Sequence, residues 1–182
     1  KASDFAMTDG LRKLGVEHVP AIATRGVLLD MAGYFNTDIV KEGTVFNRAE
    51  IEGAMKRQGI KSIEKGDVVL FYTGWLKLLG KDNKRFGSVA PGLGRDGAKY
   101  LASLDVAIIG SDTWSFEAVP FEKDAGIFEV HQILIPLNGI HILENVNTEE
   151  MVRDKAWEFL FTLGAARITG GVQSIVNPIA IR

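Results

Sequence analysis

Short hydrophobic runs of strand length alternate, over most of the chain, with segments whose hydrophobic residues recur at helical spacing. Residues 26–30 and the β-branched and aromatic run at residues 68–73 predict two buried strands. Between them, Asn47 is placed to cap a helix over residues 48–58, and Gly59 is placed to end it. The first part of the chain therefore predicts a strand, a helix and a second strand.

The same alternation continues after a polar, glycine-rich stretch at residues 77–91, which we interpret as a long surface loop. A helix is expected at residues 95–104, a strand at 106–109, a further helix at 128–135 and a strand at 140–144. Because strand–helix–strand units pair their strands in parallel, the pattern predicts an α/β fold with helices covering the sheet.

The C-terminal part has a different pattern. Thr148 is expected to cap a short helix that ends at Lys155. Three apolar runs follow at residues 157–162, 166–169 and 178–181, separated by glycine and asparagine turns, and they predict strands. We expect residues 1–182 to form a single α/β domain with a β-rich C-terminal end.

Composition narrows the class of protein. Hydrophobic residues make up 46% and charged residues 24% of the 182 residues, which is typical of a soluble globular chain and not of a disordered one. The net charge is −2 without a basic run, so nucleic acid is an unexpected partner. The sequence has no cysteine, which fits a reducing compartment, and no stretch of about 20 apolar residues. We expect a cytoplasmic protein that binds neither nucleic acid nor a membrane.

Gly92 to Gly97 match the pattern G-x-G-x-x-G, and Asp112 follows Gly92 by 20 residues. This arrangement is typical of dinucleotide-binding folds, where a strand leads directly into the first glycine. Here Pro91 precedes it, and proline lacks the N–H group that a strand donates. We interpret the motif as a helix entry at the rim of a pocket, with a nucleotide-dependent enzyme as an alternative.

His131 lies thirteen residues before Glu144, the last residue of a predicted strand. Alternation along that strand places Glu144 on the same face as Ile140 and Ile142, where a carboxylate needs a partner or a cation. The helix that carries His131 can approach this face, whereas His141 points away. The pair is either a hydrogen-bonded His–Glu pair or part of a metal site, since metal sites ordinarily use three or four ligands.

Four polar or aromatic residues follow the predicted strands at their carboxyl ends, where α/β sheets bind ligands. We expect these residues to line a substrate pocket: Trp75, Asp112, Trp114 and Glu117. The alternative for this segment is a purely structural loop, in which Asp112 makes a turn and Trp114 packs.

Several blocks of the sequence, in this order, resemble the cyclase family, which includes bacterial kynurenine formamidase and isatin hydrolase. The resemblance runs from about residue 10 to the C-terminus. The matching blocks are residues 24–30, 66–75, 110–114, His131 with 139–145, and 170–181.

The resemblance implies a swivelling β/β/α fold with a mixed sheet, and a homodimer or homotetramer. It implies a metal-dependent hydrolase that binds zinc or manganese and cleaves carbon–nitrogen bonds in small formamides or cyclic amides. His131 and Glu144 match residues that complete the metal site in formamidase-like members.

The family's motif H-x-G-T-H-x-D-x-P-x-H, which normally precedes the block at residues 24–30, does not occur in this sequence; the histidine found there is His18. The resemblance therefore implies that the other metal ligands and the catalytic histidine belong to a segment upstream of Lys1. The alternative is a non-catalytic binding or structural protein on the same fold, without a complete metal site.

Overall fold

The computed structural model describes residue 4 and residues 6–182. The chain divides into a larger unit, Arg25–Glu158, and a smaller unit that combines the residues up to Thr24 with Phe159–Arg182. The single domain expected for residues 1–182 stays a prediction.

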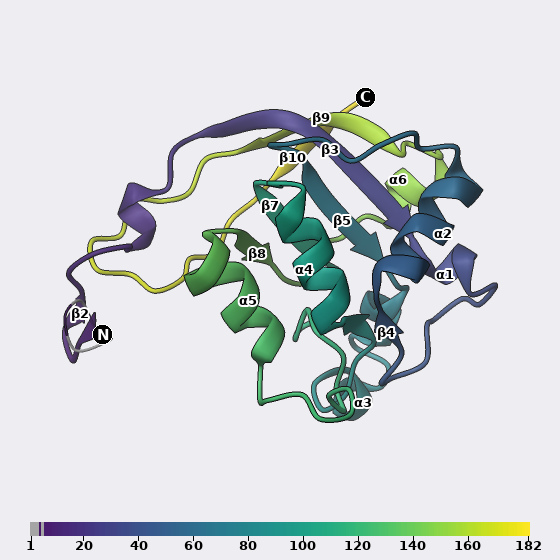
Figure 1. The fold of residues 1–182 in the computed structure, drawn as a ribbon, viewed down its shortest axis with the longest axis horizontal. Helices are drawn as coiled ribbons and strands as arrows, with labels where there is room; N and C mark the ends of the chain where they lie inside the picture. The colour runs from purple at the N-terminus through teal and green to yellow at the C-terminus, as the bar shows by residue number, and fades with distance from the viewer. Residues whose placement is uncertain (1–3, 5) are drawn as a thin grey trace. The chain divides into compact units, whose positions relative to one another are not determined.

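Four parallel strands form the centre of the larger unit. They pair in the order β3 (Ile22–Asp30), β5 (Val68–Tyr72), β7 (Ile108–Ser111) and β8 (His141–Leu143) (Figure 1). All five residues of β5 are buried, as expected for a parallel strand that is covered on both faces. The predicted parallel sheet is confirmed, although β7 begins and ends two residues later than expected.

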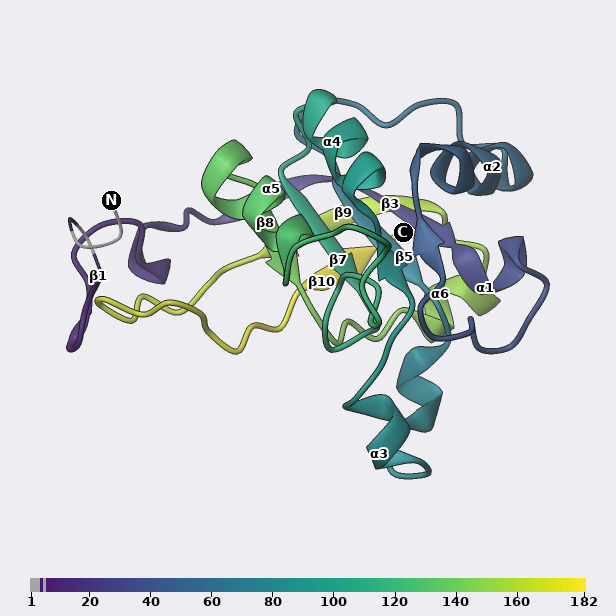
Figure 2. The ribbon, with the colours of Figure 1, turned by 60° about the horizontal axis from the view of Figure 1, so that its bottom comes forward.

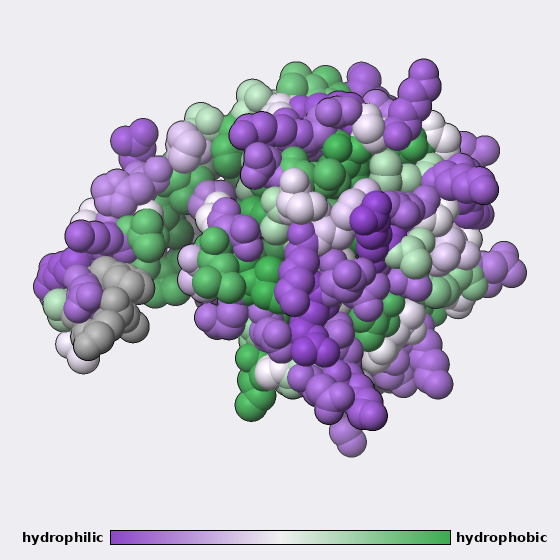
Figure 3. Space-filling model, in the orientation of Figure 1, coloured by the Kyte–Doolittle hydropathy of each residue, from purple (hydrophilic) through white to green (hydrophobic). Residues whose placement is uncertain are grey.

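Three longer helices lie on one side of this sheet: α2 (Arg48–Gln58), α4 (Arg95–Ser103) and α5 (Glu129–Asn138) (Figures 1 and 2). The helix α4 packs against both of the others. Over α5, hydrophobic residues reach the surface (Figure 3), where Ile135 and Leu137 are exposed. The fold thus places α5, which carries His131, at the outer part of the helical layer.

The ends of α2 confirm the predicted signals. The Glu50 carboxylate accepts a hydrogen bond from the Asn47 backbone N–H at 2.8 Å, and Gly59 ends the helix with a φ of 74°. The predicted end of α5 is wrong, because the helix continues through Pro136 to Asn138, and Gly139 caps it. A proline in the last turn removes a single N–H donor, and the buried residues earlier in the helix hold it in place.

Short elements complete the larger unit. The loop predicted at residues 77–91 is wrong in part, because it contains the end of η3 (Trp75–Leu78) and the helix α3 (Asn83–Phe86). A two-stranded parallel pair joins β4 (Val45–Phe46) to β6 (Gly92–Leu93). Two further short helices follow strands β3 and β8, namely α1 (Met31–Tyr34) and α6 (Glu149–Arg153).

Thr148 occupies the position before α6, but its side chain makes no capping hydrogen bond, and the helix ends at Arg153. Thr148 is therefore at the predicted cap position without the side-chain bond of a cap, and the predicted end at Lys155 is wrong.

The smaller unit is built from antiparallel pairs and irregular chain. It contains β1 (Ala6–Met7) paired with β2 (Gly10–Leu11), η2 (Val16–His18), and β9 (Glu158–Leu163) paired with β10 (Ile179–Ile181). The strand predicted at residues 166–169 is wrong, because the Ile168 N–H bonds the Ala166 carbonyl in a tight turn. Parallel strands in the larger unit and the antiparallel pair of β9 and β10 in the smaller unit together give the mixed strand directions of the expected α/β fold.

Candidate active site

His131 lies between two carboxylates. Its ring Nδ1 is 2.7 Å from Glu117 Oε1, and its ring Nε2 is 3.5 Å from Glu144 Oε1. The backbone N–H of His131 also donates to Glu117 Oε1, at 3.2 Å. The Glu117 side chain is 4% exposed, whereas that of Glu144 is 36% exposed. One side of the imidazole is therefore fixed in the interior, and the other faces a carboxylate that water can reach.

Parallel pairing explains why these residues meet. Because β7 and β8 run in the same direction, the segments that follow them leave the same edge of the sheet. Glu117 belongs to the segment after β7, and Glu144 directly follows β8. The helix α5 begins two residues before His131 and brings the imidazole to this edge.

The carboxylates set the electrostatics of the imidazole. Burial alone would lower the pKa of His131, but its hydrogen bonds to Glu117 and Glu144 outweigh that effect and raise the pKa to about 9. The proton is retained because both neighbours carry negative charge. Such a pair of carboxylates stabilises a cation placed between them, whether a proton on His131 or a metal ion that displaces it.

Aromatic rings enclose the buried side of His131. The ring of Phe128 is edge-on at a centroid distance of 5.3 Å, and that of Phe116 is at 6.4 Å. Phe121 extends this wall, with its ring 5.3 Å from that of Phe128. The rings keep water from one side of the imidazole, which strengthens its electrostatic interactions.

Asp112 is the centre of a second cluster. Its carboxylate accepts hydrogen bonds from the Thr73 N–H at 2.9 Å, the Thr73 hydroxyl at 2.6 Å and the Trp75 N–H at 3.0 Å. Burial raises the pKa of Asp112 to about 6, although these hydrogen bonds and one from Gly74 act to lower it. Asp112 also lines a small cavity of about 10 Å³, together with Tyr72, Lys77 and Thr148 among others.

Both tryptophans of the predicted pocket are held by backbone carbonyls. The indole of Trp75 is fully buried and donates to the Phe86 carbonyl at 3.2 Å. Trp114 is partly buried and donates to the Val89 carbonyl at 3.1 Å, while it packs against the hydrophobic cluster of Trp75. Of the four residues predicted to line the pocket, Glu117 is the one that the structure joins directly to His131.

The sequence did not indicate the contact between Glu117 and His131. The residues are fourteen apart, and the irregular segment between them has no periodicity that relates their side chains. Phe128 was also missed, although a signal was present, because residues three apart at the start of a helix face the same side.

The glycine motif at residues 92–97 does not leave its helix N-terminus open. The N–H of Arg95 donates to Glu122 Oε2 at 2.8 Å, and the N–H of Gly97 donates to Asn47 Oδ1 at 3.0 Å. In dinucleotide-binding folds, groups in these positions contact phosphate. Here carboxylate and amide oxygens of the chain itself take that place.

Two absences hold for the described part of the chain. Among residue 4 and residues 6–182, no group of three or more His, Cys, Asp or Glu side chains is arranged to hold a metal ion. Over the same residues, no helix has both the length and the hydrophobicity to cross a bilayer.

Comparison with known proteins places the fold. A crystal structure described as a novel cyclase superposes with a TM-score of 0.77 at 26% sequence identity, over 96% of this chain and 58% of the other. Isatin hydrolase A from Labrenzia aggregata gives a TM-score of 0.70 at 18% identity, over 92% and 65%. Isatin hydrolase A from Ralstonia solanacearum gives 0.74 at 17% identity, over 92% and 64%. The chain thus spans less than two thirds of the length of these structures.

The sequence comparisons add the family. No curated protein matches the chain. The family model described as "Putative cyclase" matches residues 6–118, which is more than half of the 182 residues. On this match and on the shared fold, the chain belongs to the putative cyclase family.

Proposed function

We propose that this chain contributes His131 and Glu144 to the metal centre of a hydrolase that cleaves the carbon–nitrogen bond of a small formamide or cyclic amide with water. One observation carries the proposal: the buried carboxylate of Glu117 holds Nδ1 of His131 and leaves Nε2 facing Glu144. Metal-binding histidines in proteins are typically oriented in this way, by a carboxylate on the ring nitrogen that does not bind the metal.

The two side chains suit zinc or manganese. Imidazole nitrogen and carboxylate oxygen are accepted ligands of both ions. Two atoms that are each about 2.1 Å from a tetrahedral ion lie about 3.4 Å apart. The 3.5 Å between His131 Nε2 and Glu144 Oε1 is close to that separation. The residues present therefore fit two positions of a divalent-metal site.

A bound divalent ion supplies a water whose pKa is lowered to about 7, and it polarises the amide oxygen. When a metal ion displaces the proton from Nε2, Glu117 keeps the other proton of His131 on Nδ1, and Nε2 then presents its lone pair. Phe128 and Phe116 keep water from the buried side of the ring. In this proposal the partly buried Trp114 lines the substrate pocket near the same edge of the sheet, and the buried Trp75 and Asp112 shape the pocket by holding the loops behind it.

The comparisons support the reaction class. Structures that share the fold include isatin hydrolases and a protein described as a potential metal-dependent hydrolase with cyclase activity. Isatin is a cyclic amide, so a lactam and an aryl formamide are suitable test substrates. A homodimer or homotetramer is part of the proposal on the family resemblance alone.

Hydrolysis of isatin and of an aryl formamide by the full polypeptide tests the proposal. We expect dialysis against EDTA to abolish hydrolysis, and Zn²⁺ or Mn²⁺ to restore it. His131→Ala should reduce the rate by about 100-fold or more, since even loss of an outer partner of a metal ligand costs about 10–100-fold. His141→Ala is the matched control, because His141 is an exposed histidine on the neighbouring strand. Hydrolysis that survives chelation, or equal rates for the two variants, contradicts the proposal.

A second candidate is a non-catalytic binding or structural protein on the same fold. It is favoured by the fact that fewer than three potential ligands converge within the part of the chain that the structure describes. This candidate predicts no hydrolysis of either substrate, and partner binding that EDTA leaves unchanged. The same chelation experiment therefore separates the two functions.

A further inference from the structure

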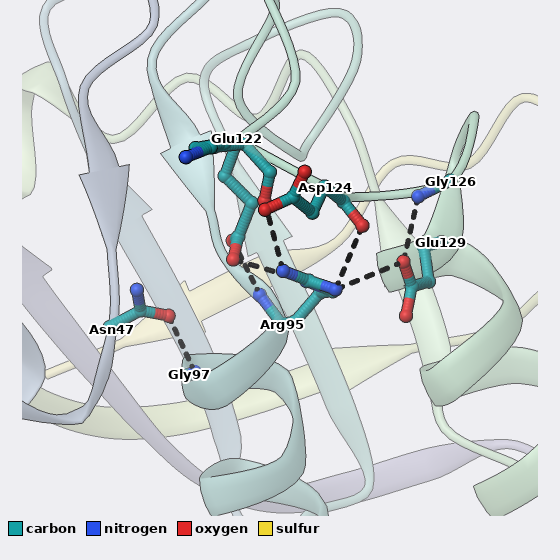
Figure 4. Close-up of polar contacts among 8 residues, drawn as sticks. Asn47, Arg95, Gly97, Glu122, Asp124, Gly126 and Glu129 are labelled. Carbon is teal, nitrogen blue, oxygen red and sulfur yellow. Dashed lines mark hydrogen bonds and ion pairs between the residues drawn. The ribbon is translucent and has the colours of Figure 1, made fainter.

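Arg95 is the first residue of α4, and its side chain contacts the segment that connects Glu117 to His131 (Figure 4). Its Nε donates to Glu122 Oε1 at 3.1 Å, while its backbone N–H donates to the other oxygen of the same carboxylate at 2.8 Å. Its terminal nitrogens donate to the Lys123 carbonyl at 3.1 Å and the Asp124 carbonyl at 3.2 Å. A single guanidinium thus binds three consecutive residues of the connecting segment.

The same guanidinium reaches the start of α5. Arg95 Nη1 is 3.7 Å from Glu129 Oε2, and this oxygen also accepts a hydrogen bond from the Gly126 N–H at 2.8 Å. Phe128, which precedes α5, has a φ of 50° and provides no side-chain cap. Glu129, two residues before His131, therefore supplies contacts that hold the first turn of α5, beside the bond from the His131 N–H to Glu117.

Glycines of the G-x-G-x-x-G motif allow the connecting segment to lie directly against this helix entry. A Cβ atom at Gly92 would be 2.3 Å from the Phe116 carbonyl oxygen and 2.5 Å from the Glu117 carbonyl carbon. A Cβ atom at Gly94 would be 2.5 Å from Glu122 Oε2. Contacts of a Cβ atom are not found at these distances, so a larger residue at Gly92 would displace the backbone of the segment, and one at Gly94 would displace the Glu122 side chain. The motif serves as a close-packing surface for the residues around Glu117.

The contacts of Arg95 differ from those of an ordinary surface ion pair. Its side chain is 29% exposed, and it bonds two carboxylates and two carbonyls at once. The planar, five-donor guanidinium can satisfy several fixed acceptors together, which lysine cannot do. Isolated exposed ion pairs contribute little, but this network joins the middle of the connecting segment, residues 122–124, to Glu129 near its C-terminal end.

We propose that Arg95 is a positioning residue that holds the segment between Glu117 and His131 and so keeps Nδ1 of His131 on Glu117. The part of this inference that concerns metal binding rests on the proposed function. The part that concerns the contact between His131 and Glu117 rests on the structure alone. Loss of Arg95 releases the start of α5, and the imidazole then loses the orientation that directs Nε2 toward Glu144.

The test compares Arg95→Gln with Arg25→Gln in the full polypeptide. Arg25 is a matched control, since its side chain is 34% exposed and contacts Asp67, Glu158 and the Ser62 carbonyl at the other end of the strands. NMR spectra of ¹⁵N-labelled imidazoles report the hydrogen-bonded Nδ1–H of His131, and the spectrum of His131→Ala assigns this signal. We expect this signal to be lost in Arg95→Gln and kept in Arg25→Gln.

Metal affinity is the second measurement, with Zn²⁺ or Mn²⁺ alone as the probe. Arg95→Gln should weaken binding by about 10–100-fold, as for other partners of a metal ligand, while Arg25→Gln should change it less than twofold. Arg95→Lys should give an intermediate affinity, because it keeps the charge but not the several simultaneous hydrogen bonds. If Arg95→Gln does not fold, Glu129→Gln removes the contact at α5 alone and is subject to the same two measurements.

A folded Arg95→Gln or Glu129→Gln variant that keeps the Nδ1–H signal and binds metal as tightly as Arg25→Gln overturns the inference. His131→Ala separates this failure from a failure of the proposed function. If wild type and His131→Ala bind metal equally, the metal proposal fails, and the NMR signal still decides the role of Arg95.

Discussion

Asp112 and Glu117 are both acids in the segment that follows β7, and they are 1% and 3% exposed, yet their charges are satisfied in different ways. Asp112 accepts hydrogen bonds from backbone N–H groups and one hydroxyl, all of which are buried. Glu117 bonds an imidazole whose other nitrogen faces a partly exposed carboxylate. The Asp112 carboxylate is thus surrounded by buried donors. In the His131 cluster, by contrast, Nε2 of the imidazole faces the partly exposed Glu144.

This difference assigns the two clusters different roles. A carboxylate with fixed neutral donors ties the ends of β5 and β7 together, and its removal leaves buried N–H groups without acceptors. A carboxylate that orients an imidazole instead controls what the far ring nitrogen can bind. The comparison therefore predicts that damage to the Asp112 cluster lowers stability, and that damage to the His131 cluster changes chemistry.

The largest expected effect is that of Asp112→Ala on folding. It removes the carboxylate that accepts from the buried N–H groups of Thr73 and Gly74, and it leaves the Trp75 N–H with only the longer bond to the Thr73 hydroxyl at 3.3 Å. Each buried donor left without an acceptor costs about 1–3 kcal/mol. We expect the free energy of unfolding, measured in urea, to fall by about 3–5 kcal/mol, against about 0.5 kcal/mol or less for the exposed Asp38→Ala. A loss below about 1 kcal/mol for Asp112→Ala would show that the cluster is not structural.

The next largest effect is the pH dependence of the free energy of unfolding, which should differ between the Asp112 and His131 clusters. Both groups have a pKa that is raised in the folded state, so the folded protein binds each proton more tightly than the unfolded chain. Proton binding by each group therefore contributes most to the free energy of unfolding below the group's ordinary pKa. This contribution is lost as the pH rises through the raised pKa. The windows are pH 3.8 to about 6 for Asp112 and pH 6.5 to about 9 for His131.

Urea unfolding across this pH range, with a chelator present, should show both decreases in the wild type. In Glu117→Gln the nearer of the two carboxylates that bond His131 loses its charge. We therefore expect the fall in the free energy of unfolding between pH 6.5 and about 9 to become smaller. The decrease at lower pH should remain. An unchanged upper window in this variant would mean that Glu117 does not raise the pKa of His131.

The smallest expected effect on stability is that of Glu144→Gln. Because the Glu144 side chain is 36% exposed and 3.5 Å from His131, its loss should change the free energy of unfolding by about 0.5 kcal/mol or less. The affinity for Zn²⁺ or Mn²⁺ should nevertheless fall by about tenfold or more. Glu149→Gln, at an exposed carboxylate that pairs with Lys77, should change neither quantity. Equal metal affinity in the two variants would remove Glu144 from the site.

Local signals in the sequence predicted the elements that position both clusters. The β-branched run at β5 and the Asn47 and Gly59 ends of α2 specify their structures through nearby residues, and the structure agrees. Where a signal was purely compositional, as at residues 166–169, the backbone made a turn instead of a strand. Strands need a partner, and composition does not supply one.

The side-chain arrangement was predictable only in part. The sequence pattern predicted that His131 lies near Glu144, because His131 is near the start of a helix and Glu144 directly follows a strand. The contacts of Glu117 and Arg95 join residues that are fourteen and twenty-seven positions apart in the sequence, so tertiary packing sets their directions. The same limit applies to Asp112, whose hydrogen bonds come from residues thirty-seven and thirty-nine positions earlier.

The most direct measurement of the central claim is anomalous diffraction from crystals of the full polypeptide grown with Mn²⁺ or Zn²⁺. The account predicts an anomalous peak about 2.0–2.2 Å from both His131 Nε2 and an oxygen of Glu144, with Nδ1 still on Glu117. A metal bound elsewhere, or a His131 ring that stays bonded to both carboxylates with no ion between Nε2 and Glu144, would contradict it.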